Sequence, residues 1–177
     1  GLQILIPLVI NNGWRSLRTD KPQIHLLRGI AGVSAMYCFF YAIAHLPLAN
    51  AMILKMSAPL FIPIIAVIWL KEKLSLLIVF VVVLGFIGVT LIINPELNQV
   101  DKVSLIALAG GLLAAIAKST VKLLTRTDNP STVVFYFAMT ALIVSTIPAY
   151  LNWQTPNIEQ LFRLILLGIF ASGGQYF

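Results

Sequence analysis

Long apolar runs alternate with short polar connections along almost the whole chain. Since an α-helix needs about 20 residues to cross the hydrocarbon core of a bilayer, each run is a candidate membrane span. The six candidates are residues 29–46, 49–70, 74–93, 103–121, 131–151 and 161–177. Residues 1–10 are apolar but too short to cross, so we expect them to be the end of a further span. The pattern predicts an all-α, polytopic transmembrane helix bundle that is truncated at both ends.

Composition excludes an ordinary soluble domain. Of the 177 residues, 59% are hydrophobic and 10% are charged, whereas soluble domains carry roughly 25% charged residues. The net charge of +6 lies in short clusters between the apolar runs, without the basic face that nucleic-acid binding needs. We therefore expect the lipid bilayer, and no nucleic acid, as a partner. Cys38 is the one cysteine of the sequence, so no intramolecular disulfide is expected.

Lys and Arg are unevenly distributed among the connections, and this bias predicts an orientation. Residues 11–28, 71–73 and 122–130 carry eight of these cations, whereas the other three connections carry two, Lys102 and Arg163. Because cytoplasmic loops are enriched in Lys and Arg, we expect the first set to be cytoplasmic. The predicted location is the cell (inner or plasma) membrane.

Catalytic patterns are missing from the sequence. The six acids all lie in connections or at span edges: Asp20, Glu72, Glu96, Asp101, Asp128 and Glu159. The chain has no HExxH, GxSxG, CxxC or P-loop pattern. Its two histidines, His25 and His45, lie near connections, and His45 is expected to cap the turn that follows it. These features argue against an enzyme, and we expect no metal site and no cofactor.

Polar side chains form one stripe on the first complete span. Its members are Ser34, Tyr37, Tyr41 and His45, spaced by three, four and four residues. This spacing places them on one face of a helix, and such a face is expected to turn away from lipid. The stripe either lines a cavity or forms hydrogen bonds with neighbouring helices.

Small residues also recur at helical spacing. They are Gly29, Gly32 and Ala35; Gly85 and Gly88; Ala107, Gly111 and Ala115; and Gly168 with Ser172–Gly174. Small side chains allow helix backbones to approach closely, so this pattern predicts packing contacts between helices.

The span at 49–70 contains features that a lipid-facing helix would not need. Lys55 stands six residues inside the apolar run that starts at Ala49, and Pro59 and Pro63 follow. Each proline lacks an N–H and leaves the carbonyl four residues earlier without a helical partner. Broken backbone at membrane depth is tolerated where protein or a water-filled cavity satisfies it. We therefore expect helix breaks at Pro59 and Pro63, with the hydroxyl of Ser57 nearby.

The ammonium group of Lys55 has two interpretations. A lysine near the centre of a span costs about 2.5–3.5 kcal/mol on insertion scales. Its stem can extend toward the non-cytoplasmic interface, which lowers this cost and requires no function. Alternatively, the charge lies in a polar cavity that binds a ligand.

Residues 27–93 resemble the EamA-type permeases of the drug/metabolite transporter superfamily. The matching features are Arg28 at the start of a span, the LPLANA turn at 46–51, SAPLF at 57–61, Glu72, and the pair Gly85 and Gly88. No single feature is specific, but their order and spacing over about 70 residues carry the resemblance. GIFASGGQYF at 168–177 is similar to a later span of the same family.

The resemblance implies ten helices in two five-helix repeats of inverted topology. Residues 1–93 would be the end of helix 2 and helices 3–5 of the first repeat. Residues 94–102 would form a non-cytoplasmic loop between the repeats. Residues 103–177 would be helices 6–8 of the second repeat, the last of them partial. An internal similarity between 26–40 and 161–177, both of which open with an arginine, agrees with inverted repeats.

The resemblance also implies transport of a small organic solute, a metabolite, amino acid or drug-like molecule, by alternating access. In the implied cavity, Ser34, Tyr37, Tyr41, Lys55 and Ser57 would face Ser172 and Gln175 across the substrate. Lys55 departs from the family pattern, in which this position is often neutral. Our hypothesis is that Lys55 pairs with an anionic group of the solute. A homodimer is a further expectation.

The competing functions require features that the sequence lacks. A channel would need a continuous polar or charged ring, and this chain has scattered single polar groups. A non-transporting membrane scaffold or assembly protein remains the alternative, although it would not need Lys55 at membrane depth beside two prolines.

Overall fold

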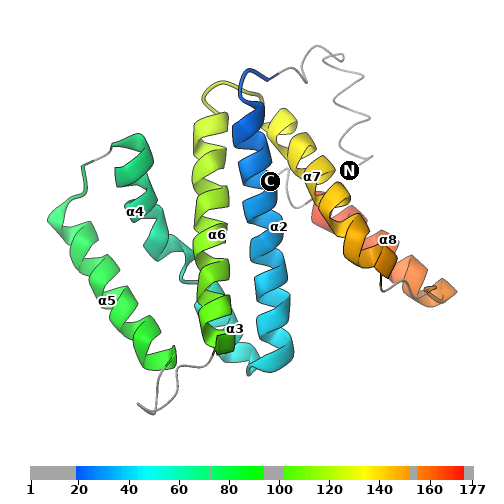
Figure 1. Ribbon diagram of the computed structural model, residues 1–177, viewed down its shortest axis with the longest axis horizontal. Coiled ribbons are helices and arrows are strands. Elements are labelled where there is room, and N and C mark those ends of the chain that lie inside the picture. The colour runs from blue at the N-terminus through cyan, green and yellow to red at the C-terminus, as the bar shows by residue number, and fades with distance from the viewer. Residues whose placement is uncertain (1–18, 72, 94–101, 152–154, 174–177) are drawn as a thin grey trace. The chain divides into compact units, whose positions relative to one another are not determined.

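The computed structural model describes residues 19–71, 73–93, 102–151 and 155–173, and the regular elements in these ranges are all α-helices (Figure 1). They are α2 (Pro22–His45), α3 (Leu48–Lys55), α4 (Ala58–Leu70), α5 (Leu76–Ile93), α6 (Lys102–Leu124), α7 (Pro130–Leu151) and α8 (Ile158–Gly173). The predicted all-α class is confirmed. Residues 1–10, the start of the 11–28 connection and nearly all of the predicted loop at 94–102 lie outside the described residues.

Four of the six predicted spans are long and apolar enough to cross a membrane. They are α2, the pair α3 and α4 taken together over Leu48–Trp69, α6 and α7. The helix α5 is apolar but shorter, and α8 is described only as far as Gly173. The two spans predicted at α5 and α8 therefore remain predictions.

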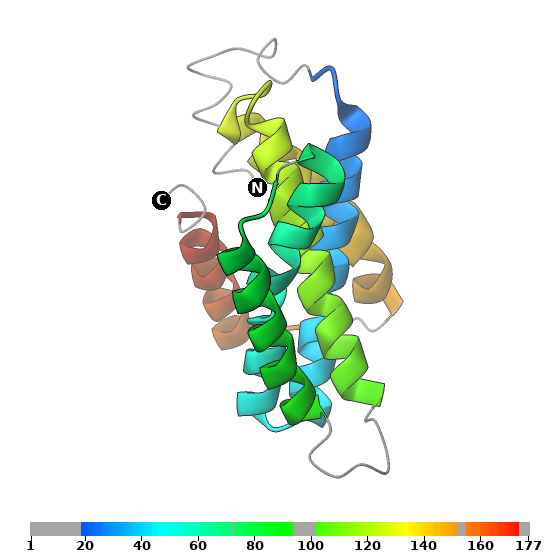
Figure 2. The ribbon, with the colours of Figure 1, turned by 90° about the vertical axis from the view of Figure 1, so that its left-hand side faces the viewer.

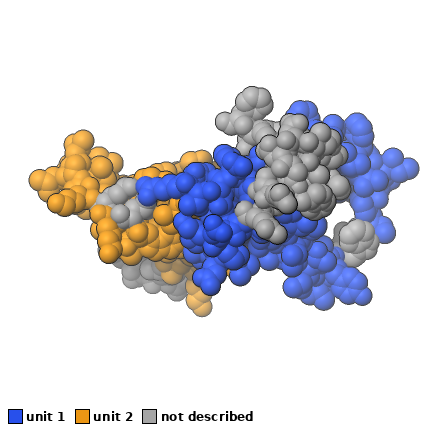
Figure 3. Space-filling model, turned by 90° about the horizontal axis from the view of Figure 1, so that it is seen from above, with its two compact units in different colours: residues 1–29, 124–177 blue, residues 30–123 orange. Residues whose placement is uncertain are grey.

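The chain divides into two compact units, which Figure 3 distinguishes by colour. Unit 1 comprises residues 1–29 and 124–177, and unit 2 comprises residues 30–123. The first eight residues of α2 belong to unit 1 and the rest of that helix belongs to unit 2.

Unit 2 consists of helices that alternate in direction. In Figures 1 and 2, the part of α2 in this unit and α5 run one way, and α4 and α6 run the other way. The connection at residues 46–47 therefore lies at the opposite end of the unit from the connection at 71–75. This arrangement agrees with the cation bias, which assigns these two connections to different sides of the membrane.

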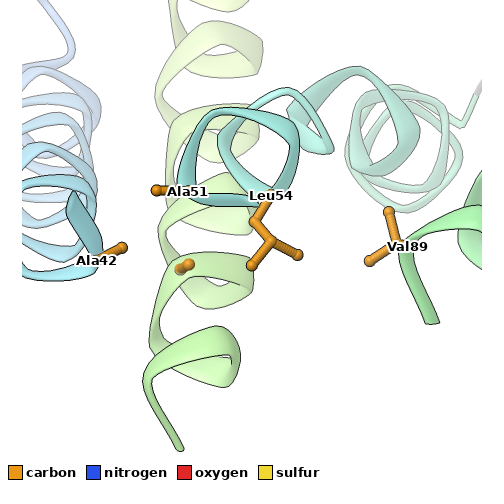
Figure 4. Packing of buried hydrophobic residues seen from close by; sticks show 5 residues of the cluster. Ala42, Ala51, Leu54 and Val89 are labelled. Carbon is orange, nitrogen blue, oxygen red and sulfur yellow. The ribbon is translucent and has the colours of Figure 1, made fainter. Parts of the chain in front are cut away.

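The main core of unit 2 is built mostly from small side chains. Figure 4 shows Leu54 of α3 lying between Ala42 of α2 and Val89 of α5. Ala51 and Ala107 complete the cluster, and Ala42, Ala51 and Leu54 are fully buried. Because lipid chains are as apolar as these side chains, helices in a membrane gain stability from close packing, which small residues permit.

Two neighbouring glycines of α6 bring its backbone against two different elements. A Cβ atom at Gly110 would lie 2.8 Å from Cβ of Cys38 in α2. At Gly111 it would collide with Oγ of Ser57, between α3 and α4. The predicted packing role is thus confirmed for Gly111. Gly88 and Gly168, by contrast, meet no described atom within 4 Å.

Candidate functional site

The helical segment after Pro47 is interrupted in its middle. The helix α3 ends at Lys55 and α4 begins at Ala58. Ser57 lies in the interruption, where it is 2% exposed and its hydroxyl donates to the carbonyl oxygen of Leu54 at 2.6 Å. The backbone N–H of Ser57 donates to the same carbonyl at 3.2 Å, so Ser57 supplies two donors to a carbonyl at the end of α3. The structure therefore places one break, at residues 56–57, just before Pro59.

The two prolines have different effects on α4. Pro59 lies in the first turn, where backbone N–H groups lack helical acceptors and proline costs nothing. Pro63 lies inside the helix, which continues to Leu70. The prediction of a break at Pro63 is wrong. The N–H missing at Pro63 would bond only to the carbonyl of Pro59, and the later turns keep their own hydrogen bonds, so the helix continues.

Lys55 extends from the end of α3 toward α2. Its Nζ atom lies 3.8 Å from the centroid of the Phe39 ring, within cation–π distance. The pair borders a cavity of about 190 Å³ in unit 2. The other lining residues are Gly32, Ala35 and Met36 of α2 and Ala107, Gly110 and Ala114 of α6. The cavity is therefore walled by small or apolar side chains and contains one charge.

The surroundings of Lys55 offset part of the cost of placing its charge in a membrane. A cation–π contact contributes about 0.5–2 kcal/mol. Lys55 also lies in the last turn of α3, where the helix dipole favours a cation by about 0.3–1 kcal/mol. The middle of these ranges lies below the insertion cost of about 2.5–3.5 kcal/mol. The ammonium group can therefore gain further stabilisation from water or from an anion in the cavity.

The residues predicted for substrate binding do not all gather at this cavity. Lys55 lines it, and the buried Ser57 supports the helix end beside it. Tyr37 and Tyr41 are each 44% exposed and do not line the cavity, and Ser34 is half-buried. Ser172 belongs to α8, and Gln175 lies outside the described residues. A solute-binding role for these residues stays a prediction.

His45 occupies the position expected of a cap. It is the last residue of α2, and its Nδ1 atom lies 2.8 Å from the carbonyl oxygen of Tyr41. Its ring stacks on the Tyr41 ring with centroids 4.3 Å apart. Tyr41 lies four residues before His45 in the same helix, so its carbonyl already faces the backbone N–H of His45, and the ring nitrogen is a second donor to it.

Sequence reasoning missed the partner of Lys55 and the walls of the cavity. The signal was present as small residues at helical spacing, and we interpreted it only as packing. On α2, Gly32, Ala35 and Phe39 are spaced by three and four residues, so the aromatic ring lies on the same face of the helix as the two small residues. Which ring faces Lys55 depends on how α2 packs against α3. The periodicity of a single helix gives no information on that packing.

Unit 1 contains a second group of polar side chains that sequence reasoning did not connect. His25 Nε2 donates to Oδ2 of Asp128 at 2.7 Å, and Thr19 Oγ1 donates to the same oxygen at 2.6 Å. The side chains of His25 and Asp128 are 1% and 6% exposed. The ring of His25 also packs on Tyr136 of α7, with centroids 4.5 Å apart. The cluster joins the start of α2 to the connection between α6 and α7.

The carboxylate of Asp128 is held in its charged form by these donors. Burial by itself would raise the pKa of Asp128. Hydrogen bonds from Thr19, His25 and Thr127, together with the charge of His25, outweigh burial and lower this pKa below its ordinary value. Asp128 is thus a satisfied anion with a structural role at the end of two helices.

Residues 1–94 match the EamA-like transporter family. The chain belongs to this family. Three curated relatives illustrate its range. The S-adenosylmethionine uptake transporter of Rickettsia bellii is 30% identical over 173 residues, which cover 97% of this chain and 58% of that protein. The riboflavin transporter of Brucella anthropi is 28% identical, with 99% and 64% covered. The pseudopaline exporter of Pseudomonas aeruginosa is 26% identical, with 98% and 62% covered.

This EamA-like chain therefore spans about 60% of the length of these relatives. No solved structure gives a significant match. Family membership and the apolar helices identify an integral membrane protein.

Proposed function

We propose that this protein carries a small organic solute across the membrane by alternating access, and that the cavity beside Lys55 is part of the solute site. The single observation that carries the proposal is the placement of Lys55. A charge at the broken middle of a membrane-spanning segment faces a cavity, and ionisable groups inside a membrane are functional sites by default.

The named relatives support the class of cargo. They are named for uptake of S-adenosylmethionine, transport of riboflavin and export of pseudopaline. These three solutes differ in structure, and two of the names specify opposite directions. The relatives therefore support a small organic solute for this protein, and its identity and the direction of transport are matters for experiment.

Inverted repeats give the proposal its mechanism. The family match ends at residue 94, which supports a repeat boundary in 94–102. With residues 11–28, 71–73 and 122–130 on the cytoplasmic side of the cell membrane, successive spans would alternate as inverted repeats require. Cysteine labelling from either side of the membrane, at positions 71 and 47, tests this orientation. Labelling of both positions from the same side would contradict it.

A scaffold without transport is the competing function. It predicts that the purified, intact protein in liposomes moves no solute. We expect instead that liposomes containing the protein accumulate at least one member of a panel of amino acids, nucleosides, flavins and organic acids. Liposomes without protein are the control for leakage. Failure of every solute in both directions, with the protein shown to be folded, would favour the scaffold.

A further inference from the structure

We propose that the cavity beside Lys55 is a subsite for one carboxylate group of the solute, and that Phe39 is the positioning residue that holds the ammonium group toward it. This inference rests on the proposed transport function and deepens it. It names the chemical group that enters the cavity and a residue that sequence reasoning did not assign.

The contact of the Lys55 ammonium group leaves its charge uncompensated. The ion pairs of the described ranges include His25 with Asp128 and Arg163 with Glu159, both in unit 1. Lys55 lies in unit 2, where the contact of its Nζ atom is the ring of Phe39. An aromatic face stabilises a cation without neutralising it. The ammonium group therefore keeps its full charge for a ligand.

The cavity has the size of a head group. Pockets that enclose a whole drug-sized ligand have volumes of about 300–1,000 Å³, and this cavity measures about 190 Å³. One water molecule occupies about 30 Å³ in the liquid, so the space suits a head group and not a complete metabolite. The remainder of the solute would extend beyond it.

The walls of the cavity add no second charge to that of Lys55. The side chains of Gly32, Ala35, Ala107, Gly110 and Ala114 offer no hydrogen-bond donors, and Met36 offers a thioether. One ammonium group matches the single charge of a carboxylate. A dianionic phosphate would leave one charge without a partner in an apolar site, which is costly. Charge matching therefore favours a carboxylate over a phosphate.

The ring of Phe39 orders the side chain of Lys55 before the anion binds. A free lysine side chain has four rotatable bonds and many rotamers. A contact that orders it in advance therefore reduces the entropy lost when the anion binds. With its Nζ atom 3.8 Å from the ring centroid, the ammonium group has one face on Phe39, and its remaining N–H donors are available to a carboxylate. Phe39 acts through Lys55 and needs no contact with the solute.

The test measures binding of simple head-group probes to the intact, purified protein. The probes are acetate and benzoate, their neutral counterparts acetamide and benzamide, and methylphosphonate, all at constant ionic strength. We expect the two carboxylates to raise the melting temperature in a saturable way, and the amides and methylphosphonate to have at least tenfold weaker effects. Equal shifts with benzoate and benzamide would overturn the proposal.

Four variants locate the effect. Lys55→Met should abolish the carboxylate shift, whereas Phe39→Leu should weaken apparent affinity by about 2- to 30-fold, the range of a cation–π contact. Phe39→Trp keeps an aromatic face and should restore binding. The matched control is Phe40→Leu, because Phe40 is 55% exposed and does not line the cavity. Equal losses in Phe39→Leu and Phe40→Leu, or an unchanged shift in Lys55→Met, would refute the assignment.

Transport measurements separate this inference from the proposed function. For a transported carboxylate, Phe39→Leu should raise the half-saturating concentration and leave the maximal rate unchanged, as expected of a residue that acts on binding. Transport that persists unchanged in Lys55→Met would refute the subsite and leave the transporter intact. Carboxylate binding that depends on Lys55 in a protein that transports nothing would support the subsite and refute the transporter.

Discussion

Lys55 in unit 2 and Asp128 in unit 1 are both charged groups in an otherwise apolar protein, and their surroundings differ in kind. Asp128 is 6% exposed and accepts hydrogen bonds from His25 and Thr19. Lys55 has an aromatic ring on one side and a cavity on the other. A charge whose hydrogen-bonding capacity is filled contributes to structure. A charge that is only partly compensated beside open space is suited to a ligand.

The largest effect should come from removing the less satisfied charge. Lys55→Met should reduce transport of a carboxylate solute by at least about tenfold, because a hydrogen bond to a charged group contributes about 1.5–3 kcal/mol. The free energy of unfolding should stay equal or rise, since the insertion cost of the lysine disappears. Uptake into liposomes and thermal unfolding measure the two quantities.

The control for that change is Lys118→Met. Lys118 is exposed on α6 and does not line the cavity. The Lys118→Met variant should transport the solute at the rate of the original protein. A similar loss in both variants would mean that net charge, and not the position of Lys55, controls transport.

Asp128→Asn should show the opposite pattern. The substitution keeps the shape of the side chain but removes the charged acceptor of the hydrogen bonds from Thr19, His25 and Thr127, each of which contributes about 1.5–3 kcal/mol when one partner is charged. Because the amide can still accept one of them, we expect a loss of about 1–3 kcal/mol in the free energy of unfolding. Solute affinity in the folded fraction should be unchanged. A large rise in the half-saturating concentration with unaltered stability would contradict the structural role.

The pH dependence of stability follows from the lowered pKa of Asp128. A carboxyl group whose pKa is lower in the folded state contributes stability above its unfolded value of about 4, and the contribution is lost as the pH falls through the folded value. The difference in melting temperature between the original protein and Asp128→Asn should therefore be constant near neutrality and shrink below about pH 4. A difference that grows on acidification would contradict this sign.

Thr19→Val should have the smallest effect. It removes one donor to Asp128 and the acceptor of the Lys21 N–H, and it leaves the bond from His25 in place. We expect a loss of about 1 kcal/mol in the free energy of unfolding. In the Asp128→Asn background the same substitution should cost less, and a double-mutant cycle measures that difference. Strict additivity would show that the two side chains do not interact.

The sequence predicted the features that a bilayer imposes on the chain. In lipid each backbone polar group must be satisfied within the protein, so span positions follow from hydropathy, and a charge with two prolines marks an irregular segment. The exact position of the helix break could not be predicted from this pattern. Proline is tolerated in the first turn of a new helix, so the break precedes Pro59 and none occurs at Pro63.

Contacts between distant residues were beyond sequence reasoning. Thr19 and His25 meet Asp128 across 109 and 103 residues, and their types are common in connections. Phe39 was one of several aromatic residues on α2, and its helical spacing from Gly32 and Ala35 does not show which neighbouring helix its ring faces. Tyr37 and Tyr41 had the stronger sequence signal as cavity residues, yet the described cavity lies on a different part of α2.

The adjacent glycines Gly110 and Gly111 have a mechanical consequence. Successive residues of an α-helix point about 100° apart, so at one height α6 is in close contact with two neighbours in different directions, α2 at Cys38 and the α3–α4 junction at Ser57. Turning α6 about its own axis would drive bulkier side chains into both neighbours. A rotation or translation of α6 would therefore disturb its contacts with both neighbours at once. We expect the three segments to shift together.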